Sequence, residues 1–209
     1  MSENQLVVVV DYGMGNLRSV AKIVQRAQVD CIVSGDASDI LAADRLILPG
    51  VGAFGDGMAN LRTRGILEPL TEAVIERGVP LLGICLGMEL LASDSEEHGH
   101  HDGLGWIPGH VRALHGNGLR VPHVGWNGIT NVQAHPIFSG IDDGATFYFT
   151  HSFVFHPDDP GAVVATCDYG EIFAAAVSKG HIFGCQFHPE KSQRNGGMVI
   201  HRFLFEDRP

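Results

Sequence analysis

The sequence has few positively charged side chains. Its 209 residues include 14 lysines and arginines against 24 aspartates and glutamates, which gives a formal net charge of −10. The cations are scattered and form no lysine- or arginine-rich cluster. Because phosphate neutralisation needs grouped cations, this argues against nucleic acid as the main partner. The acidic balance is most simply explained by solubility.

Cysteines are also few, and there is no long apolar segment. The four cysteines lack the C-x-x-C spacing of a metal or redox motif: Cys31, Cys85, Cys167 and Cys185. The N-terminal stretch MSENQLVVVVDYG has no basic region, and its apolar run is too short for a signal peptide or a membrane span. We therefore expect no membrane contact, free thiols and a reduced, cytoplasmic location.

The first half of the chain alternates strand-like and helix-like segments. Apolar runs at 6–10, 45–49 and 79–84 are typical of strands buried on both faces, and a shorter strand is predicted at 31–34. Helical patterns separate them at 16–29, where Asn16 has the place of an N-cap, at 56–78 and at 86–93. Repeated β-α-β units of this kind predict a parallel sheet covered by helices on both faces.

The second half has closely spaced strands instead. Strands are predicted at 145–155, 161–167, 172–178 and 181–187, with short turns that favour antiparallel hairpins, and a final helix at 197–205. No repeat, low-complexity segment or linker divides the chain. We therefore predict one α/β domain over residues 1–209, with a three-layer, mainly parallel sheet flanked by helices and antiparallel strands in the C-terminal half.

A cysteine between two glycines follows the predicted strand at 79–84. In GICLGMELL (83–91) Cys85 lies between Gly83 and Gly87 and directly before a helical pattern. This strand–turn–helix arrangement is typical of a nucleophile elbow. There the helix N-terminus would lower the pKa of the thiol, and the N–H of Leu86 would point at a developing oxyanion. The alternative is a buried structural cysteine.

A candidate base and its orienting acid lie near the C-terminus. The stretch FHPE (187–190) follows a predicted strand, so His188 could take the proton of Cys85 and return it to the leaving group. Glu190 could orient the imidazole, as the acid does in any nucleophile–base–acid triad.

Two other motifs invite different functions. PGVGAFGDG (49–57) contains G-x-G-x-x-G, but it follows a later strand than a dinucleotide fingerprint does, so we interpret it as a backbone segment beside the nucleophile. The run EEHGHHDG (96–103) offers His98, His100 and His101, but their spacing is not that of a zinc site and favours a solvated loop. We predict neither a cofactor nor a metal.

Seven segments, in order along nearly the whole chain, resemble one known family. They are DYGMGNLRSV (11–20), LPGVGAFGDGM (48–58), GICLGM (83–88), GLGWIPGHV (103–111), PHVGWN (122–127), YFTHSF (148–153) and GCQFHPEKS (184–192). Together they are similar to the class I, triad-type glutamine amidotransferases, and within that class to the glutaminase subunits of imidazole glycerol phosphate synthase. The resemblance implies a flavodoxin-like fold and hydrolysis of L-glutamine in histidine biosynthesis. It also implies delivery of ammonia to a (β/α)8-barrel cyclase subunit in a heterodimer, where imidazole glycerol phosphate and aminoimidazole carboxamide ribonucleotide are made.

The resemblance also implies roles for particular residues. Cys85 would form a glutamyl thioester, His188 would be the general base and acid, and Glu190 would orient it. The implied oxyanion strand is Gly50, Val51 and Gly52, beside Leu86, and the implied substrate contacts are Gly87 and Glu89. The residues that would face the cyclase are Asn16, His123, Trp126, Asn127, Tyr148 and Lys191.

Position 89 departs from the family pattern. The motif usually continues G-x-C-x-G-x-Q, and in this sequence Glu89 occupies the position of the glutamine. A carboxylate about 6 Å from a thiolate repels it by about 3 kcal/mol at an effective dielectric near 20, which would raise the pKa of Cys85. An ionised carboxylate also cannot donate a hydrogen bond. Glu89 could contact a donor, lower the activity until the cyclase reorganises the site, or mark a paralogue that serves another synthase.

Two competing classes remain open. A cysteine hydrolase of the α/β-hydrolase type has the order nucleophile, acid, histidine, whereas here the acid follows the histidine by two residues. A scaffold subunit inactivated by Glu89 is the non-enzyme alternative, and the presence of Cys85, His188 and Glu190 argues against it.

Overall fold

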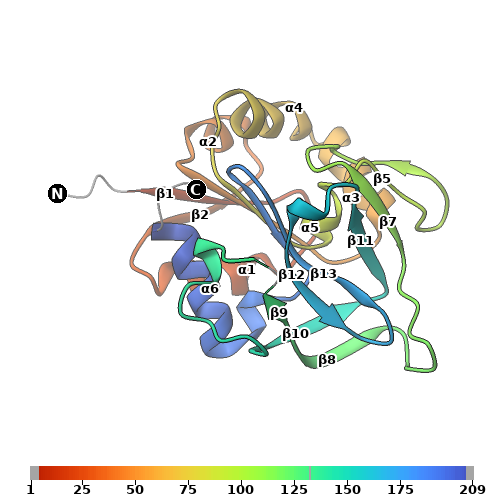
Figure 1. Ribbon diagram of the computed structural model, residues 1–209. Helices are drawn as coiled ribbons and strands as arrows, with labels where there is room; N and C mark the ends of the chain where they lie inside the picture. Colours follow the sequence, from red (N-terminus) through yellow and green to blue (C-terminus); the bar gives the residue numbers. More distant parts are fainter. Residues whose placement is uncertain (1–4, 132, 206–209) are drawn as a thin grey trace.

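A computed structural model describes residues 5–131 and 133–205 of the chain. Its centre is an eight-stranded sheet in the order β2-β1-β3-β4-β14-β13-β12-β9 (Figure 1). The strands are β1 (Leu6–Val10), β2 (Asp30–Ser34), β3 (Arg45–Gly50), β4 (Leu81–Cys85), β9 (Thr130–Asn131), β12 (Val163–Asp168), β13 (Ile172–Lys179) and β14 (Ile182–Cys185). The first five strands in that order are parallel, and β13, β12 and β9 continue antiparallel. The predicted mainly parallel sheet with antiparallel strands from the second half is confirmed.

Helices cover both faces of this sheet (Figure 1). On one face lie α1 (Leu17–Gln25) and α6 (Gln193–Phe205), and on the other α2 (Ala37–Ala42), α3 (Phe54–Thr63) and α4 (Leu67–Thr71). The strand residues Val7–Val10 are fully buried and divide alternately between two apolar clusters, one under α1 and α6 and the other under α2, α3 and α4. Alternation on a strand with two covered faces explains why the sequence shows a continuous apolar run there.

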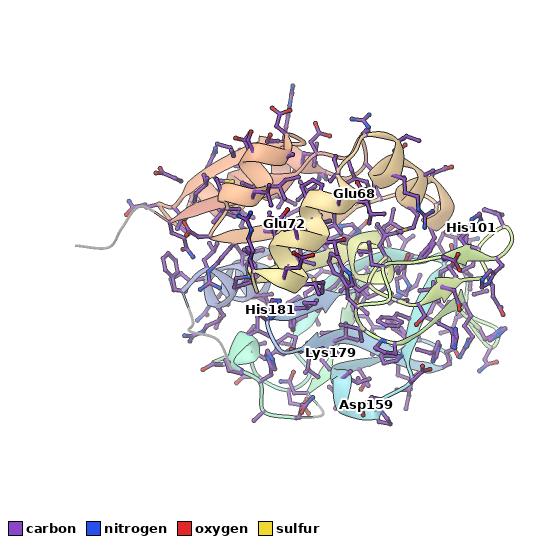
Figure 2. The ribbon with its side chains drawn as sticks, turned by 90° about the horizontal axis from the view of Figure 1, so that it is seen from above. Glu68, Glu72, His101, Asp159, Lys179 and His181 are labelled. Atoms are coloured by element: carbon purple, nitrogen blue, oxygen red, sulfur yellow. The ribbon has the colours of Figure 1, made fainter. Side chains whose placement is uncertain are left out.

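The predicted helix at 56–78 is three shorter segments. After α3, Gly65 has a left-handed backbone with φ +67°, and α4 is followed by a π-helical turn over Glu72–Glu76. His181, which lies below this turn in Figure 2, has Nε2 2.7 Å from the carbonyl oxygen of Val74. The single prediction was wrong because glycine readily adopts the conformation that ends a helix, and the apolar periodicity continues across the break. No described helix is long and apolar enough to cross a membrane.

The predicted strand at 145–155 is two strands in two different sheets. β10 (Thr146–His151) pairs with β8 (His123–Gly128), whereas β11 (Phe153–Pro157) pairs with β7 (Gly109–Ala113), which continues to β5 (Asp94–Ser95) and β6 (His101–Asp102). The chain changes sheet at Ser152, whose carbonyl accepts the N–H of Leu114. This crossing places Thr150 and His151 beside the end of β4. Short 3-10 turns complete the fold at Pro136–Phe138, Pro160–Ala162 and Pro189–Lys191.

Candidate active site

Three neighbouring parallel strands end at one edge of the sheet, and the candidate site lies there. In the ladder Gly50 of β3 is opposite Cys85 of β4, and Cys185 of β14 is opposite Ile84. The carboxyl edge of parallel strands is where open α/β sheets bind ligands. Cys85 is the last residue of β4 and directly precedes α5 (Leu86–Glu89), so the predicted strand–turn–helix arrangement is present, although the helix is shorter than the 86–93 predicted.

Cys85 has the strained backbone of a nucleophile elbow. Its φ is +53° and its ψ is −111°, a conformation that costs a non-glycine residue of order 1–3 kcal/mol. The neighbouring glycines are needed for space: a Cβ on Gly87 would lie 1.8 Å from the carbonyl oxygen of Leu48, and one on Gly83 would lie 2.6 Å from that of Gly87. Gly87 therefore packs against β3 and does not line the pocket. Its predicted contact with the substrate stays a prediction.

The thiol of Cys85 is buried beside two polar groups. Its Sγ lies 3.9 Å from the carbonyl oxygen of Thr150 and 3.9 Å from Nε2 of Gln186. Burial, and then the charge of Glu89, raise the pKa of Cys85 well above that of a free thiol, while the Leu86 N–H and the Gln186 amide act in the opposite direction. The expected net lowering by the helix N-terminus is therefore not seen in this resting geometry. A four-residue helix has little dipole, and desolvation outweighs it.

Glu89 is buried one helical turn from the nucleophile. Only 5% of it is exposed, and its Oε1 accepts a 2.7 Å hydrogen bond from Nε2 of Gln186. Burial raises the pKa of Glu89 to about 7, against the hydrogen bond from Gln186, and Glu97 raises it further. From the sequence Glu89 is expected to be ionised, but with a pKa of about 7 a large fraction of it is protonated near neutral pH. A protonated carboxyl can donate a hydrogen bond, as the amide of glutamine does.

Gln186 is a site residue that the sequence argument missed. Its Nε2 is the group that contacts both Glu89 and Cys85, the side chain is fully buried, and its Oε1 has no hydrogen-bond partner among the described residues. The available signal was a polar residue inside an otherwise apolar strand, two positions before His188.

His188 and Glu190 form a buried pair. His188 Nδ1 lies 2.9 Å from Glu190 Oε1, and both side chains are 1% exposed. The backbone of His188 is held by its N–H to the Tyr148 carbonyl at 2.9 Å and by its carbonyl to the Ser192 hydroxyl at 2.7 Å. Since Nδ1 faces the carboxylate, Nε2 is the nitrogen available to a substrate or a nucleophile, and within the described residues it has no other partner.

The predicted oxyanion segment borders the same pocket. Gly50 is packed so closely that a Cβ there would lie 2.5 Å from the Tyr12 hydroxyl, Gly52 has φ +120°, and Val51 is 42% exposed. A cavity of about 360 Å³ opens beside them, lined by Val51, Gly52, Cys85, Leu86, Glu89, Glu97, Pro122, Thr150, His151, Ser152 and Phe153. The structure thus brings the elbow, Glu89 and part of the glycine segment to one cavity.

Glu97 and His151 are pocket residues that were not predicted. Glu97 belongs to the acidic, histidine-rich run that was interpreted as a solvated loop, and His151 is the last residue of β10, inside the stretch predicted as one strand. His151 Nδ1 donates to the carbonyl of Phe153 at 2.9 Å, so its Nε2 accepts from His123 Nδ1 at 3.0 Å. Burial lowers the pKa of His151 to about 3 and that of His123 to about 4, so both rings are neutral near pH 7.

The residues predicted to face a partner occupy different environments. Lys191 Nζ lies 5.5 Å from the ring centroid of Tyr148, which meets half-exposed Trp126 edge-on at 6.1 Å. His123 is instead 2% exposed, stacked between Phe149 and Tyr169, so its side chain supports the strand pair rather than the surface. Asn127 donates to the Asp168 carbonyl at 3.0 Å, and Asn16 precedes α1 without a side-chain capping bond.

The two motifs that suggested other ligands lie in different parts of the fold. Gly50 of the G-x-G-x-x-G run ends the third strand along the chain, and Gly55 already lies inside α3. Within residues 5–131 and 133–205, no group of three or more histidine, cysteine, aspartate or glutamate side chains is arranged to hold a metal.

Comparison with known proteins defines the class first. Residues 8–207 match the family described as glutamine amidotransferase class-I, so the chain belongs to that family. The imidazole glycerol phosphate synthase subunit HisH of Syntrophotalea carbinolica is 47% identical over 204 residues, 95% of this chain and 98% of the relative. The HisH subunit of Caulobacter vibrioides is 46% identical over 213 residues, 98% of this chain and 100% of the relative.

Within the class, the chain is therefore a member of the HisH subunit family, and the resemblance noted in the sequence is confirmed. Among solved structures, PurLQS from Thermotoga maritima superposes with a TM-score of 0.74 over 97% of this chain and 98% of that chain. Its 20% identity makes this likeness evidence for the fold alone.

Proposed function

We propose that this chain hydrolyses L-glutamine to glutamate and ammonia with Cys85, His188 and Glu190 as a catalytic triad. The observation that carries the proposal is the combination of a strained cysteine elbow with the buried His188–Glu190 pair at the ends of adjacent strands β4 and β14. Membership of the class-I glutamine amidotransferase family supports it. The triad acts within one domain spanning residues 1–209.

The chemistry follows from the groups in the site. His188 Nε2 takes the thiol proton of Cys85, and the thiolate attacks the side-chain amide carbon of glutamine. The tetrahedral oxyanion is held by the Leu86 N–H and by an N–H of the Gly50–Gly52 segment. His188 then gives its proton to the amide nitrogen, ammonia leaves, and a glutamyl thioester remains on Cys85. A water activated by His188 hydrolyses the thioester, which releases glutamate and restores the thiol.

Two carboxyl groups on the pocket wall suit an amino-acid substrate. Glu97 and Glu89 both line the cavity. A carboxylate accepts hydrogen bonds from an ammonium group, so Glu97 recognises the α-ammonium of glutamine. Glu89 in its protonated form takes the place of a neutral amide beside the reacting group.

The relatives' name extends the proposal to a partner. They are named as subunits of imidazole glycerol phosphate synthase. We propose that this chain forms a heterodimer with a (β/α)8-barrel cyclase subunit, through a surface that includes Trp126, Tyr148 and Lys191, with Asn16 and Asn127 at its border. Ammonia then enters the formation of imidazole glycerol phosphate and aminoimidazole carboxamide ribonucleotide in histidine biosynthesis. A reducing cytoplasm suits the free thiol that the nucleophile requires.

Covalent labelling tests the proposal directly. A thiol-reactive glutamine analogue should modify Cys85 alone, as mapped by peptide mass spectrometry, and excess L-glutamine should protect it. The Cys85→Ser variant is the matched control and should not be labelled. Labelling spread over Cys31 and Cys85 without protection by glutamine would contradict a glutamine site at this elbow.

One observation favours a second reading of the same site. Burial, and then the charge of Glu89, raise the pKa of Cys85, which favours the thiol form in the isolated chain. This favours a glutaminase whose activity is low in the isolated chain and rises when a partner reorganises the pocket. If an authentic cyclase binds without raising the activity, a paralogous role with another synthase replaces it.

A further inference from the structure

Glu97 joins the wall of the pocket to the helix that follows the oxyanion segment. It lies in the turn between β5 and β6, next to the hairpin end that carries His101 at the rim of the molecule (Figure 2). Its Oε2 accepts a 2.6 Å hydrogen bond from the N–H of Phe54, which lies 43 positions earlier in the chain. The same side chain lines the cavity beside Val51 and Gly52.

The hydrogen bond from Phe54 to Glu97 caps the start of α3 from a distant part of the chain. The N-cap position is Ala53, whose methyl side chain cannot accept a hydrogen bond, and no side-chain cap from it is present. The first N–H groups of a helix have no intrahelical partner, and a negative charge there is favourable. Glu97 thus supplies, from a distant turn, an acceptor for the N–H of Phe54, the first helical residue, which a side chain at the N-cap does not usually reach because it accepts from the second or third helical residue.

The capped residue is one anchor of the oxyanion segment. Gly50 is held on the other side by its place in the β3–β4 ladder, opposite Cys85. Only Val51, Gly52 and Ala53 lie between this pairing and Phe54, whose side chain is fully buried. With both ends held, the direction of the Val51 N–H depends on the two anchors, and Gly52 at φ +120° is the residue with freedom to turn.

The rest of the turn holds Glu97 in place. The Glu97 N–H donates to the hydroxyl of fully buried Ser95 at 3.1 Å. The His101 ring lies over the first turn of α3 so closely that a Cβ on Gly55 would be 2.7 Å from it. His98, Gly99 and His100 are exposed, as expected for a solvated loop, whereas Glu97 and His101 are half-buried against the start of α3.

We propose that Glu97 is a positioning residue of the glutaminase reaction, which fixes the oxyanion segment by capping α3 at Phe54 while it faces the substrate pocket. The inference rests on the proposed glutaminase function. It gives one carboxylate two tasks: its negative charge attracts the substrate ammonium, and its hydrogen-bond acceptor holds the backbone that must stabilise the transition state. Occupancy of the pocket and alignment of the oxyanion segment are thereby linked through a single side chain.

Two substitutions separate these tasks. Glu97→Gln removes the charge but leaves an amide oxygen to accept from Phe54, so KM for glutamine should rise about tenfold with kcat within about twofold of wild type. Glu97→Ala removes both, so kcat should fall a further tenfold or more in addition to the same rise in KM, because a displaced oxyanion donor costs about 10²-fold in rate. Glu96→Gln, an exposed neighbour that loses the same charge, is the matched control and should behave as wild type.

A second readout follows the hydrogen bond itself. Amide hydrogen exchange at Phe54 should stay slow in Glu97→Gln and become at least tenfold faster in Glu97→Ala, with the thermal unfolding midpoint showing that both variants are folded. The positioning role would be overturned if the two variants had equal kcat values while amide exchange at Phe54 became faster in the alanine variant alone. Absence of glutamate release by the wild-type chain with its partner would instead overturn the proposed function, so the two failures are distinguishable.

Discussion

The site contains two buried carboxyl side chains in contrasting surroundings. Glu190 is paired with His188 at 2.9 Å, a partner that can become a cation. Glu89 accepts a 2.7 Å hydrogen bond from Nε2 of Gln186, a neutral amide that cannot become a cation. A buried carboxylate is tolerated when it is matched by a positive charge, and otherwise it protonates. Glu89 has no such positive partner, and its burial raises its pKa to about 7.

The difference gives the two carboxyl groups, and the residues paired with them, different tasks. On the His188 side a charge can develop and move during the reaction, because its counter-charge is already in place. On the Glu89 side any negative charge adds to that of the Cys85 thiolate, and Nε2 of the Gln186 amide lies against both groups. We therefore expect that substitutions of His188 or Glu190 remove catalysis, whereas a neutral residue in place of Glu89 improves it.

The largest effect is expected from the His188 side. His188→Ala should lower kcat for glutamine hydrolysis by about 10³-fold or more, and Glu190→Gln by about 10²-fold, since the acid only orients and stabilises the imidazole. Steady-state glutamate release measures both rates. Circular dichroism and the unfolding midpoint should show folded proteins, and a Glu190→Gln variant with wild-type kcat would contradict the triad.

Removing the partner of Glu89 comes next. Gln186→Leu leaves Glu89 buried without its 2.7 Å donor and should lower the free energy of unfolding by about 2 kcal/mol. Denaturant unfolding at pH 8 measures the loss. The double variant Gln186→Leu/Glu89→Leu should recover part of it, because both polar groups are then gone. An additive loss in the double variant would mean that the two side chains do not interact.

The raised pKa of Glu89 also predicts how stability depends on pH. Because the folded chain holds the Glu89 proton up to about pH 7 and the unfolded chain releases it near its ordinary pKa of 4.5, the folded state binds more protons between these values. The contribution of Glu89 to stability is therefore lost as the pH rises through this window, by up to about 3 kcal/mol. Unfolding curves at pH 5, 6, 7 and 8 should show the wild type losing stability relative to Glu89→Gln, and parallel curves would refute the shifted pKa.

Glutamine at position 89 should improve catalysis. Glu89→Gln removes the negative charge beside Cys85 and restores a neutral amide, so kcat/KM should rise about tenfold at pH 8, the equivalent of one pKa unit. Near pH 6 the wild-type carboxyl is largely protonated, so the advantage should fall toward twofold or less. An unchanged or lower kcat/KM at pH 8 would show that Glu89 serves the substrate in its ionised form.

The smallest effect is expected at Tyr12. Its hydroxyl is buried beside Gly50 and has no hydrogen-bond partner among the described residues, and burial together with the charges of Cys85 and Glu89 raises its pKa. Tyr12→Phe keeps the ring and removes an unpaired polar group, so the unfolding free energy should stay the same or rise by up to about 1 kcal/mol. A loss of more than 1 kcal/mol would reveal a hydrogen bond that stabilises the fold.

Much of this arrangement could be predicted from the sequence because local patterns determine it. Apolar runs at 6–10 and 79–84 specify strands buried on both faces, and glycines around Cys85 specify a crowded turn. What could not be predicted depends on contacts between distant segments. The switch of sheet at Ser152 is invisible in an unbroken strand pattern, and the bond from Glu97 to Phe54 joins positions 43 apart. The state of Glu89 depends on its burial against Gln186, which no spacing reveals.

The most direct test of the account is glutamate release from L-glutamine by this chain, alone and with a barrel cyclase subunit plus its nucleotide ligand, beside Cys85→Ala under the same conditions. The account predicts slow release by the isolated chain, a large rise with the liganded partner, and none above background by the variant in either state. Release that persists in Cys85→Ala, or none by the wild type with the partner shown to be bound, would contradict it.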